Sequence, residues 1–237
     1  MNVYETSNIG DLLARIGYAG RGIVIGKSED GKKAAIAYFL MGRSQNSRNR
    51  IFKENGEEVI INAFDPSKLE DPTLIIYSPI KRVGGKLIVT NGDQTDTVAE
   101  FLQRGESFEA ALETREFEPD VPNFTPRISG LLNLGTGSYK MSILKSANAA
   151  GTACDRYTYS YASLAGSGHF LHTYQGDGNP LPTFAGEPKR VRIPDAPDDL
   201  AREIWDNLDT ENKISLYVRY IDLATGAIEN RMLNKNN

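Results

Sequence analysis

Apolar residues along this chain follow mainly the short rhythm of β-strands. Residues 22–27 and 33–40 are apolar at nearly every position, and the sequence Glu29-Asp30-Gly31 between them is typical of a hairpin turn. Strands that are apolar on both faces need cover on both sides. We therefore expect a layered architecture in which other elements pack against each face of this hairpin.

Further strands are predicted wherever short apolar runs are separated by turn-forming residues. Residues 51–64 predict a second hairpin around Asn55-Gly56. The runs at 74–77 and 86–90, with Gly84-Gly85 between them, predict a third pair of strands. A further strand is predicted to begin at Ile128. The remaining predicted strands are residues 139–146, 155–163, 168–174, 189–193, 213–222 and 227–233.

Four other segments have the character of helices, with apolar residues at spacings of three or four where the pattern is clearest. They are residues 9–16, 97–104, 107–115 and 195–208. The last is the strongest prediction, because Asp195 can cap it and Pro197 suits its first turn. Helices outside two packed sheets would cover the doubly apolar strands, so we predict an α+β protein.

The composition narrows the class of protein. The chain has 237 residues, of which 40% are hydrophobic and 24% are charged, so residues 1–237 are expected to form one large domain. Its net charge of -4 gives no general attraction to nucleic acid or to an anionic membrane. No apolar run approaches the roughly 20 residues that span a bilayer. We therefore expect neither nucleic acid nor membrane as a partner.

Cysteine and histidine are too scarce for the common metal and disulfide sites. The single Cys154 excludes an intramolecular disulfide framework and suits a reducing compartment. His169 and His172 stand three apart on a predicted strand, so their side chains face opposite sides. We therefore predict no metal, no cofactor and a cytoplasmic location.

A basic stretch follows the first hairpin and is the first candidate for chemistry. Residues 42–50 carry Arg43, Arg48 and Arg50 among small amides and hydroxyls, with no acidic residue. Every polar side chain there can donate hydrogen bonds, and the fork of a guanidinium group matches phosphate oxygens. The stretch therefore predicts phosphate recognition, although a solvated basic loop would have the same composition.

The loop at residues 91–96 is the second candidate. An Asn-Gly turn after a strand places backbone N–H groups where an anion can reach them, and the helix predicted to follow adds partial positive charge. Alternatively, Asn91-Gly92 is an ordinary turn and Thr95 or Asp96 an ordinary helix cap.

Several reaction classes lack their sequence signature. The chain has no GxxxxGK[ST] phosphate loop, no GxSxG elbow and no GxGxxG opening a βαβ unit. Arginines, a tyrosine, amides and carboxylates remain. This set suits binding of a phosphorylated small molecule and proton transfer without a cofactor.

The order and spacing of these residues resemble the archaeal-type IMP cyclohydrolase family over about residues 20–145. The resemblance rests on Arg43-Ser44, Tyr77, Val89-Thr90-Asn91-Gly92-Asp93-Gln94-Thr95-Asp96, Glu118-Pro119-Asp120 and Thr125-Pro126-Arg127-Ile128. The family closes 5-formamidoimidazole-4-carboxamide ribonucleotide (FAICAR) to inosine monophosphate (IMP), the last step of purine synthesis. The resemblance implies the same reaction, a purine nucleotide as partner, and a four-layer αββα sandwich like that of the N-terminal nucleophile hydrolases.

The resemblance also implies roles for individual residues. Arg43 would orient the substrate and stabilise charge, Tyr77 would hydrogen bond at the reacting centre, and Glu118 would transfer protons. Further substrate contacts are expected from Ser44, Arg48, Lys81, Asn91, Gly92, Asp93, Thr125 and Arg127. Two alternatives stay open: Tyr77 as a core tyrosine and Glu118 as a solvated loop carboxylate.

The sequence departs from the family pattern at three places. Gly42 stands where a small hydroxyl residue is usual, Ser78-Pro79 replaces an amide and a thiol, and Lys81 replaces an arginine. The Gly- and Pro-rich segment 176–182 is more similar to bacterial relatives and could be a lid or an ordered connection. The alternative functions are an amide hydrolase of the same layered fold and a non-catalytic nucleotide-binding protein. A homo-oligomer is also left open.

Overall fold

The computed structural model describes residues 4–70, 72 and 76–236 of the chain, and two antiparallel sheets dominate it. The six-stranded sheet has the order β11 (Lys189–Arg192), β10 (Ser167–His172), β1 (Arg21–Lys27), β2 (Lys33–Met41), β12 (Lys213–Asp222) and β13 (Ile228–Asn234). The seven-stranded sheet has the order β3 (Arg50–Asn55), β4 (Glu58–Ala63), β5 (Ile80–Val83), β6 (Lys86–Thr90), β7 (Arg127–Asn133), β8 (Tyr139–Ser146) and β9 (Cys154–Tyr161).

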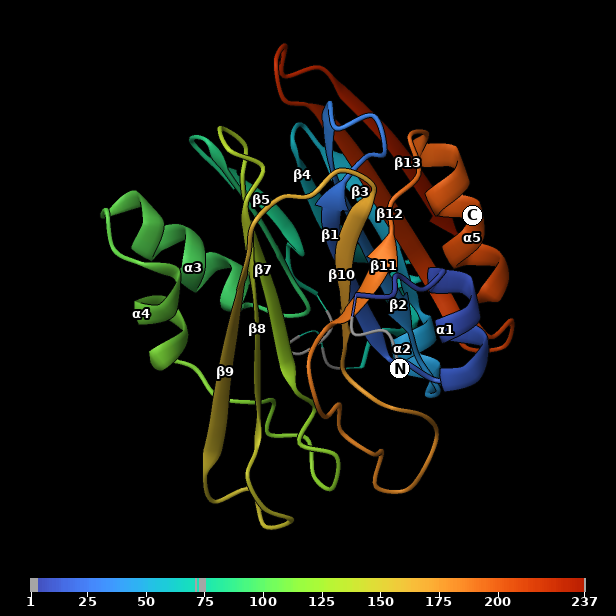
Figure 1. The fold of residues 1–237 in the computed structure, drawn as a ribbon. Coiled ribbons are helices and arrows are strands. Elements are labelled where there is room, and N and C mark those ends of the chain that lie inside the picture. Colours follow the sequence, from blue (N-terminus) through green and yellow to red (C-terminus); the bar gives the residue numbers. More distant parts are fainter. Residues whose placement is uncertain (1–3, 71, 73–75, 237) are drawn as a thin grey trace.

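The two sheets face each other across the main hydrophobic core (Figure 1). Ile23 and Tyr38 enter this core from paired positions of β1 and β2, and Val89 and Ile128 enter it from β6 and β7. Val24, the next residue along β1, points to the opposite face and belongs to a second core. This alternation explains why the central strands are apolar at nearly every position.

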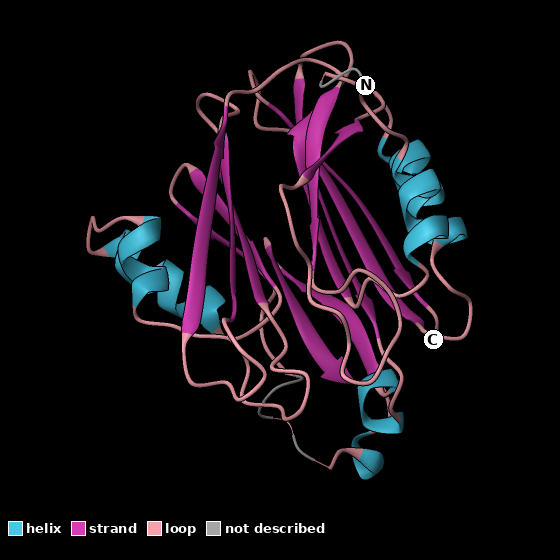
Figure 2. Ribbon diagram, turned by 60° about the horizontal axis from the view of Figure 1, so that its bottom comes forward, coloured by secondary structure: helices cyan, strands magenta, loops and turns pink. Residues whose placement is uncertain are grey.

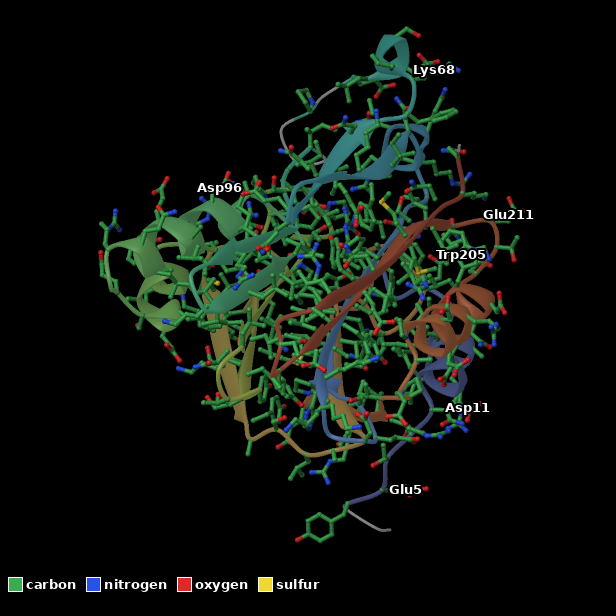
Figure 3. All side chains as sticks on the ribbon, turned by 90° about the horizontal axis from the view of Figure 1, so that it is seen from above. Glu5, Asp11, Lys68, Asp96, Trp205 and Glu211 are labelled. Carbon is green, nitrogen blue, oxygen red and sulfur yellow. The ribbon has the colours of Figure 1, made fainter. Side chains whose placement is uncertain are left out.

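Short helices cover parts of the outer faces. Figure 2 shows helices on the outer side of each layer of strands. The helices α1 (Ile9–Ile16) and α5 (Pro197–Asn207) pack on the six-stranded sheet, and α3 (Gln94–Gln103) and α4 (Phe108–Glu113) pack on the seven-stranded one. Trp205 on α5 and Asp96 on α3 mark these two opposite sides of the molecule (Figure 3). The short α2 (Gln45–Arg48) and η1 (Pro66–Lys68) lie at one end of the sheets.

The predicted four-layer αββα sandwich of the N-terminal nucleophile hydrolase type is wrong. The described residues form a mostly β structure, with 13 strands in two large antiparallel sheets and a longest helix of 11 residues. Double-sided burial is confined to central strands such as β1 and β2. The edge strand β9 instead exposes Arg156, Thr158 and Ser160 along its outer face. Short helices over part of each sheet therefore suffice to cover the apolar central strands. The prediction from the sequence was wrong in expecting complete helical layers.

Most of the predicted elements are confirmed, with one substitution in the seven-stranded sheet. The hairpins at 22–40 and 51–64 form β1–β2 and β3–β4, and the helices at 9–16 and 195–208 form α1 and α5. Leu74 and Ile75 of the strand predicted at 74–77 lie outside the described residues, and Ile76 and Tyr77 are not in a strand. The strand that pairs with β6 is instead β5. The sequence did not predict β5 as a strand because its two central residues, Lys81 and Arg82, are charged. No helix within the described ranges is long and apolar enough to cross a membrane.

A buried arginine ties the two sheets together. Arg219 on β12 is 1% exposed, and its Nε and Nη2 donate to Asn230 Oδ1 at 3.0 Å and to the Tyr217 hydroxyl at 2.7 Å. Its Nη1 donates to the Glu57 carbonyl at 2.7 Å, in the turn between β3 and β4 of the opposite sheet. All three of its donor nitrogens thus have protein acceptors, which is what a buried guanidinium group needs.

Replacing this arginine should destabilise the fold. Arg219→Met removes three hydrogen bonds and leaves buried acceptors unsatisfied, so we expect the free energy of unfolding to fall by roughly 3 kcal/mol. Denaturation with urea, monitored by circular dichroism, measures the change. A loss below about 1 kcal/mol would show that this network contributes little to holding the sheets together.

Candidate functional site

A polar cavity of about 250 Å³ lies where segments from both sheets meet. The start of β1, the residues after β2 and two loops around Asn123 and Leu181 form its walls. Its lining residues are Tyr18, Arg21, Arg43, Ser44, Ser47, Asp120, Asn123, Thr125, Tyr174 and Leu181. Of the residues predicted from the sequence, Arg43, Ser44 and Thr125 thus line one cavity.

Arg43 lies at the exposed side of this cavity. Its Nη1 donates to Asp177 Oδ1 at 2.5 Å and to the Gly178 carbonyl at 3.0 Å, and its guanidinium carbon lies 5.4 Å from the centre of the Tyr18 ring. The 176–182 segment therefore holds Arg43 through an acidic side chain. Ser44 caps α2 by accepting from the Ser47 backbone N–H at 3.1 Å.

Arg21 lies deeper in the cavity wall. It is the first residue of β1, and its backbone N–H donates to Thr173 Oγ1 at 3.1 Å. The side chain is 8% exposed, and its Nε has no hydrogen-bond partner among the described residues. Burial alone would lower the pKa of Arg21, but the nearby Glu118 carboxylate raises it above the ordinary value. Arg21 is therefore a permanent buried cation.

Arg50 is a second buried cation, at the start of β3 in the opposite sheet. Its side chain is fully buried, and its Nε donates to the Ser47 carbonyl at 2.7 Å. Neither Nη1 nor Nη2 finds an acceptor in the part of the chain that the structure describes. Burial lowers the pKa of Arg50, and the positive charge of Arg21 lowers it further. The two guanidinium groups therefore lie close enough to repel each other.

Glu118 is the buried carboxyl group of this centre. It is 3% exposed, so the alternative of a solvated loop carboxylate is wrong. Its backbone N–H donates to the Thr125 carbonyl at 2.9 Å. Burial raises the pKa of Glu118 to about 7, although the positive charges of Arg21 and Arg127 favour its ionised form. Near neutral pH the group can therefore both accept and donate a proton.

Tyr77 lies between the hydrophobic core and the buried charges. Its hydroxyl is 2.7 Å from the hydroxyl of Tyr38, and its ring belongs to the core between the sheets. Burial raises the pKa of Tyr77, while Arg21 and Arg50 oppose that shift. The tyrosine is thus a core residue whose hydroxyl lies in the electric field of both arginines.

Thr125 links the two loops of the cavity. Its backbone N–H and its Oγ1 both donate to the Asp120 carboxylate, at 2.6 and 2.5 Å. The same Oγ1 lies 2.6 Å from the hydroxyl of Tyr174. Asp120 therefore fixes the loop, and the cavity wall, through Thr125.

The 91–96 loop supports the site from behind and does not line the cavity. Asn91 is buried, and it donates to the Pro126 carbonyl at 2.8 Å and accepts from the Ile128 N–H at 2.8 Å. Asp93 forms an ion pair with Arg127 at 2.7 Å. A Cβ atom on Gly92 would come within 2.4 Å of Arg127 Nη1, so a larger residue there would displace the guanidinium group. This loop therefore positions Arg127, whose charge acts on Glu118.

Two predicted contacts lie away from the cavity. Arg48 donates from Nε to the Gly42 carbonyl at 3.1 Å and from Nη2 to Asn212 Oδ1 at 2.9 Å. Lys81 forms an ion pair with Asp96 on α3 at 2.7 Å. The three arginines of residues 42–50 thus have different surroundings: Arg43 lines the cavity, Arg50 is buried behind Ser47, and Arg48 bonds to Asn212 away from the cavity.

Sequence reasoning missed Arg21, Arg50 as a site residue, and Tyr174. Arg21 had a detectable signal, because it is in phase with Ile23 and Ile25, whose side chains enter the core between the sheets. A charged residue in a core stripe must have a buried partner or function. Tyr174 had no comparable signal, since its contact with Thr125 joins residues far apart in the sequence.

A larger cavity of about 520 Å³ lies elsewhere, against the outer face of the seven-stranded sheet. Phe108, Leu131 and Tyr161 line it, and its Lys140 is paired with Glu109. Its size does not make it the better candidate, because the buried cation Arg21, whose pKa is raised by the buried Glu118, lines the smaller cavity. Among the residues described, no group of three or more His, Cys, Asp or Glu side chains could hold a metal ion.

Comparison with known proteins gives one consistent result. A family model described as IMP cyclohydrolase-like protein matches residues 18–226. A curated protein of Methanococcus aeolicus named IMP cyclohydrolase is 32% identical over 123 residues, which cover 50% of this chain and 60% of that protein. Proteins of the same name from Methanopyrus kandleri and Methanocaldococcus jannaschii are 34% and 33% identical, over 47% and 49% of this chain and 57% of each relative. The chain therefore matches less than two thirds of these relatives' length.

The buried carboxyl group should make stability depend on pH. Because the pKa of Glu118 is about 7 in the folded chain and 4.5 is its ordinary value, the folded state holds the extra proton between these values. The stability that the folded state gains from protonated Glu118 is fully present below pH 4.5 and is lost as the pH rises through 7. Glu118→Gln should therefore gain stability relative to the wild type between pH 4.5 and 8, by a total on the order of 3 kcal/mol.

Urea denaturation of both proteins across this pH range measures that difference. Glu116→Gln, which alters an exposed carboxyl on the same segment, controls for the change in formal charge. A stability difference between Glu118→Gln and the wild type that stays constant from pH 5 to 8 would contradict the raised pKa.

Proposed function

Because the chain belongs to the IMP cyclohydrolase-like family, we propose that it closes FAICAR to IMP with loss of water. One observation carries this proposal: the matched residues 18–226 include every residue that lines the 250 Å³ cavity, together with Arg50, Tyr77 and Glu118. Two of the relatives that match about half of this chain are named IMP cyclohydrolase. The substrate partner we propose is thus a purine nucleotide.

Ring closure makes three demands on the protein. The carboxamide nitrogen must bond to the formyl carbon, which turns the formyl oxygen into an oxyanion and leaves a proton to be removed from nitrogen. The resulting carbinolamine then loses its hydroxyl group as water, together with the proton of the formamido nitrogen. The site must therefore hold the two groups in contact, stabilise the oxyanion and move protons.

Glu118 meets the demand for proton transfer. As a carboxylate it takes the proton from the attacking carboxamide nitrogen, and as a carboxylic acid it returns that proton to the oxyanion, which becomes the hydroxyl group of the carbinolamine. In the second step it takes the formamido proton and passes it to the departing hydroxyl group, which leaves as water. A pKa of about 7 suits both steps at neutral pH, because neither form is scarce. Burial is the cause of that pKa, so the cavity wall itself prepares the group for catalysis.

Arg43 meets the demand for orientation. It lies on the exposed side of the cavity beside Ser44, where a phosphate group can bind while keeping part of its hydration. A nucleotide would compete there with the Asp177 carboxylate that Arg43 contacts. The segment around Asp177 would then shift when the substrate enters.

The other predicted residues take supporting roles. Thr125 lines the cavity and contacts substrate, and Tyr77 hydrogen bonds near the reacting centre. Asn91, Gly92 and Asp93 act through Arg127: Asp93 pairs with its guanidinium group, Gly92 leaves room for that group, and Asn91 holds the backbone on both sides of it through Pro126 and Ile128. A cytoplasmic location stays a prediction, and a homo-oligomer stays open.

Turnover with purified protein tests the function. We expect the wild type to convert FAICAR to IMP, followed by chromatography of the nucleotides. Glu118→Gln keeps the shape of the side chain and removes its proton transfer, so kcat should fall by about 10²–10⁴ while the affinity for IMP changes little.

Two results would refute these assignments. A wild type that binds IMP but leaves FAICAR unchanged would be a non-catalytic nucleotide-binding protein. If Glu118→Gln turned over normally, another carboxyl group would have to transfer the proton, and Asp120 in the cavity wall is the first candidate.

A further inference from the structure

Four arginines are buried among the described residues, and they differ in how their donors are used. Arg219 has a protein acceptor for each of its three nitrogens, and Arg127 is paired with Asp93 and Gln94. Arg21 Nε and both Nη atoms of Arg50 find no acceptor in the ranges described. Burying a cation without its hydrogen bonds is costly, so such groups are retained where a ligand completes them.

The two incomplete arginines converge on the cavity from opposite sheets. Arg21 lines it from the first residue of β1. Arg50, the first residue of β3, lies behind the cavity wall: its Nε donates at 2.7 Å to the carbonyl of Ser47, which lines the cavity, and its charge acts on that of Arg21. The floor of the cavity, between the ends of the two sheets, is therefore cationic.

The charges around this floor do not balance within the described part of the chain. Glu118 and Asp120 are the carboxyl groups beside it, and the neighbouring hydroxyls belong to Tyr18, Tyr38, Tyr77 and Tyr174. Asp120 is already occupied by two bonds from Thr125, and Asp93 neutralises Arg127 from behind. Glu118, which is partly protonated near neutral pH, leaves Arg21 and Arg50 with an excess of positive charge.

We propose that Arg21 and Arg50 form an anion site at the floor of the cavity, and that this site binds the formyl oxygen as it becomes an oxyanion. The identity of the bound oxygen rests on the proposed cyclohydrolase function, whereas the existence of the anion site does not. The phosphate group remains at Arg43, because a dianion at the exposed side of the cavity keeps part of its hydration. Both buried arginines then touch the reacting atoms and are catalytic residues.

Arg50→Met tests the site most sharply, because it removes an incomplete buried charge while keeping the bulk of the side chain. The melting temperature without ligand should equal or exceed that of the wild type, since a buried unpaired charge is lost together with a single hydrogen bond. Arg219→Met is the matched control, with a buried arginine that is fully hydrogen bonded, and its melting temperature should fall.

Ligand measurements separate the oxyanion from the phosphate. Arg50→Met should lower kcat for FAICAR by about 10²–10³, the cost of losing one oxyanion donor. Its affinity for ribose 5-phosphate, measured by calorimetry, should stay within about twofold of the wild type. Arg43→Ala should behave in the opposite way, with at least roughly tenfold weaker binding of ribose 5-phosphate.

A small monoanion tests the site without reference to ring closure. At constant ionic strength, formate in place of chloride should raise the melting temperature of the wild type and not that of Arg50→Met. If the wild type fails to convert FAICAR but keeps this formate effect, the cyclohydrolase proposal fails and the anion site stands.

Three results would overturn the inference. A melting temperature of Arg50→Met as low as that of Arg219→Met, or failure of Arg50→Met to fold, would give Arg50 a structural role. If Arg50→Met lost ribose 5-phosphate binding and kept its kcat for FAICAR, the phosphate would bind to the buried arginines. An equal formate effect in the wild type and in Arg50→Met would show that Arg50 binds no anion.

Discussion

The burial of two guanidinium groups beside a single shared carboxyl group is the constraint on which the candidate site depends. Arg21 and Arg50 begin strands in opposite sheets, so the face-to-face packing of the sheets brings their charges together. Within the described residues, neither side chain has its hydrogen bonds completed. Buried charges of this kind are costly without an anion, and this cost is the physical basis of the proposed anion site.

The same constraint sets the chemistry of Glu118. Burial favours the neutral carboxylic acid, and the arginines favour the carboxylate, so the pKa settles near 7. Fewer positive charges would leave the group protonated at neutral pH, and more exposure would leave it ionised. The proposed proton transfer and the proposed anion site therefore depend on one buried cluster, and the loop 91–93 contributes by holding Arg127 close to it.

The sequence predicted local features well and long-range ones poorly. The hairpin around Glu29-Asp30-Gly31 and helix α5 follow from turn chemistry and periodicity, and both were predicted correctly. The αββα sandwich was wrong, because apolar central strands do not reveal how far helices extend over a sheet. Arg48 and Lys81 were expected to contact substrate; neither lines the cavity, and they bond to Asn212 and Asp96, because spacing along the chain carries no information about such contacts.

A crystal structure of the protein with bound IMP tests the central claim most directly. The account predicts the base of IMP at the floor of the 250 Å³ cavity, with a nitrogen of Arg21 or Arg50 within hydrogen-bond distance of the nucleotide. It also predicts the phosphate at Arg43, with the Asp177 carboxylate displaced from that arginine. IMP bound in the 520 Å³ cavity beside α4, or bound with its phosphate on Arg50, would contradict the account.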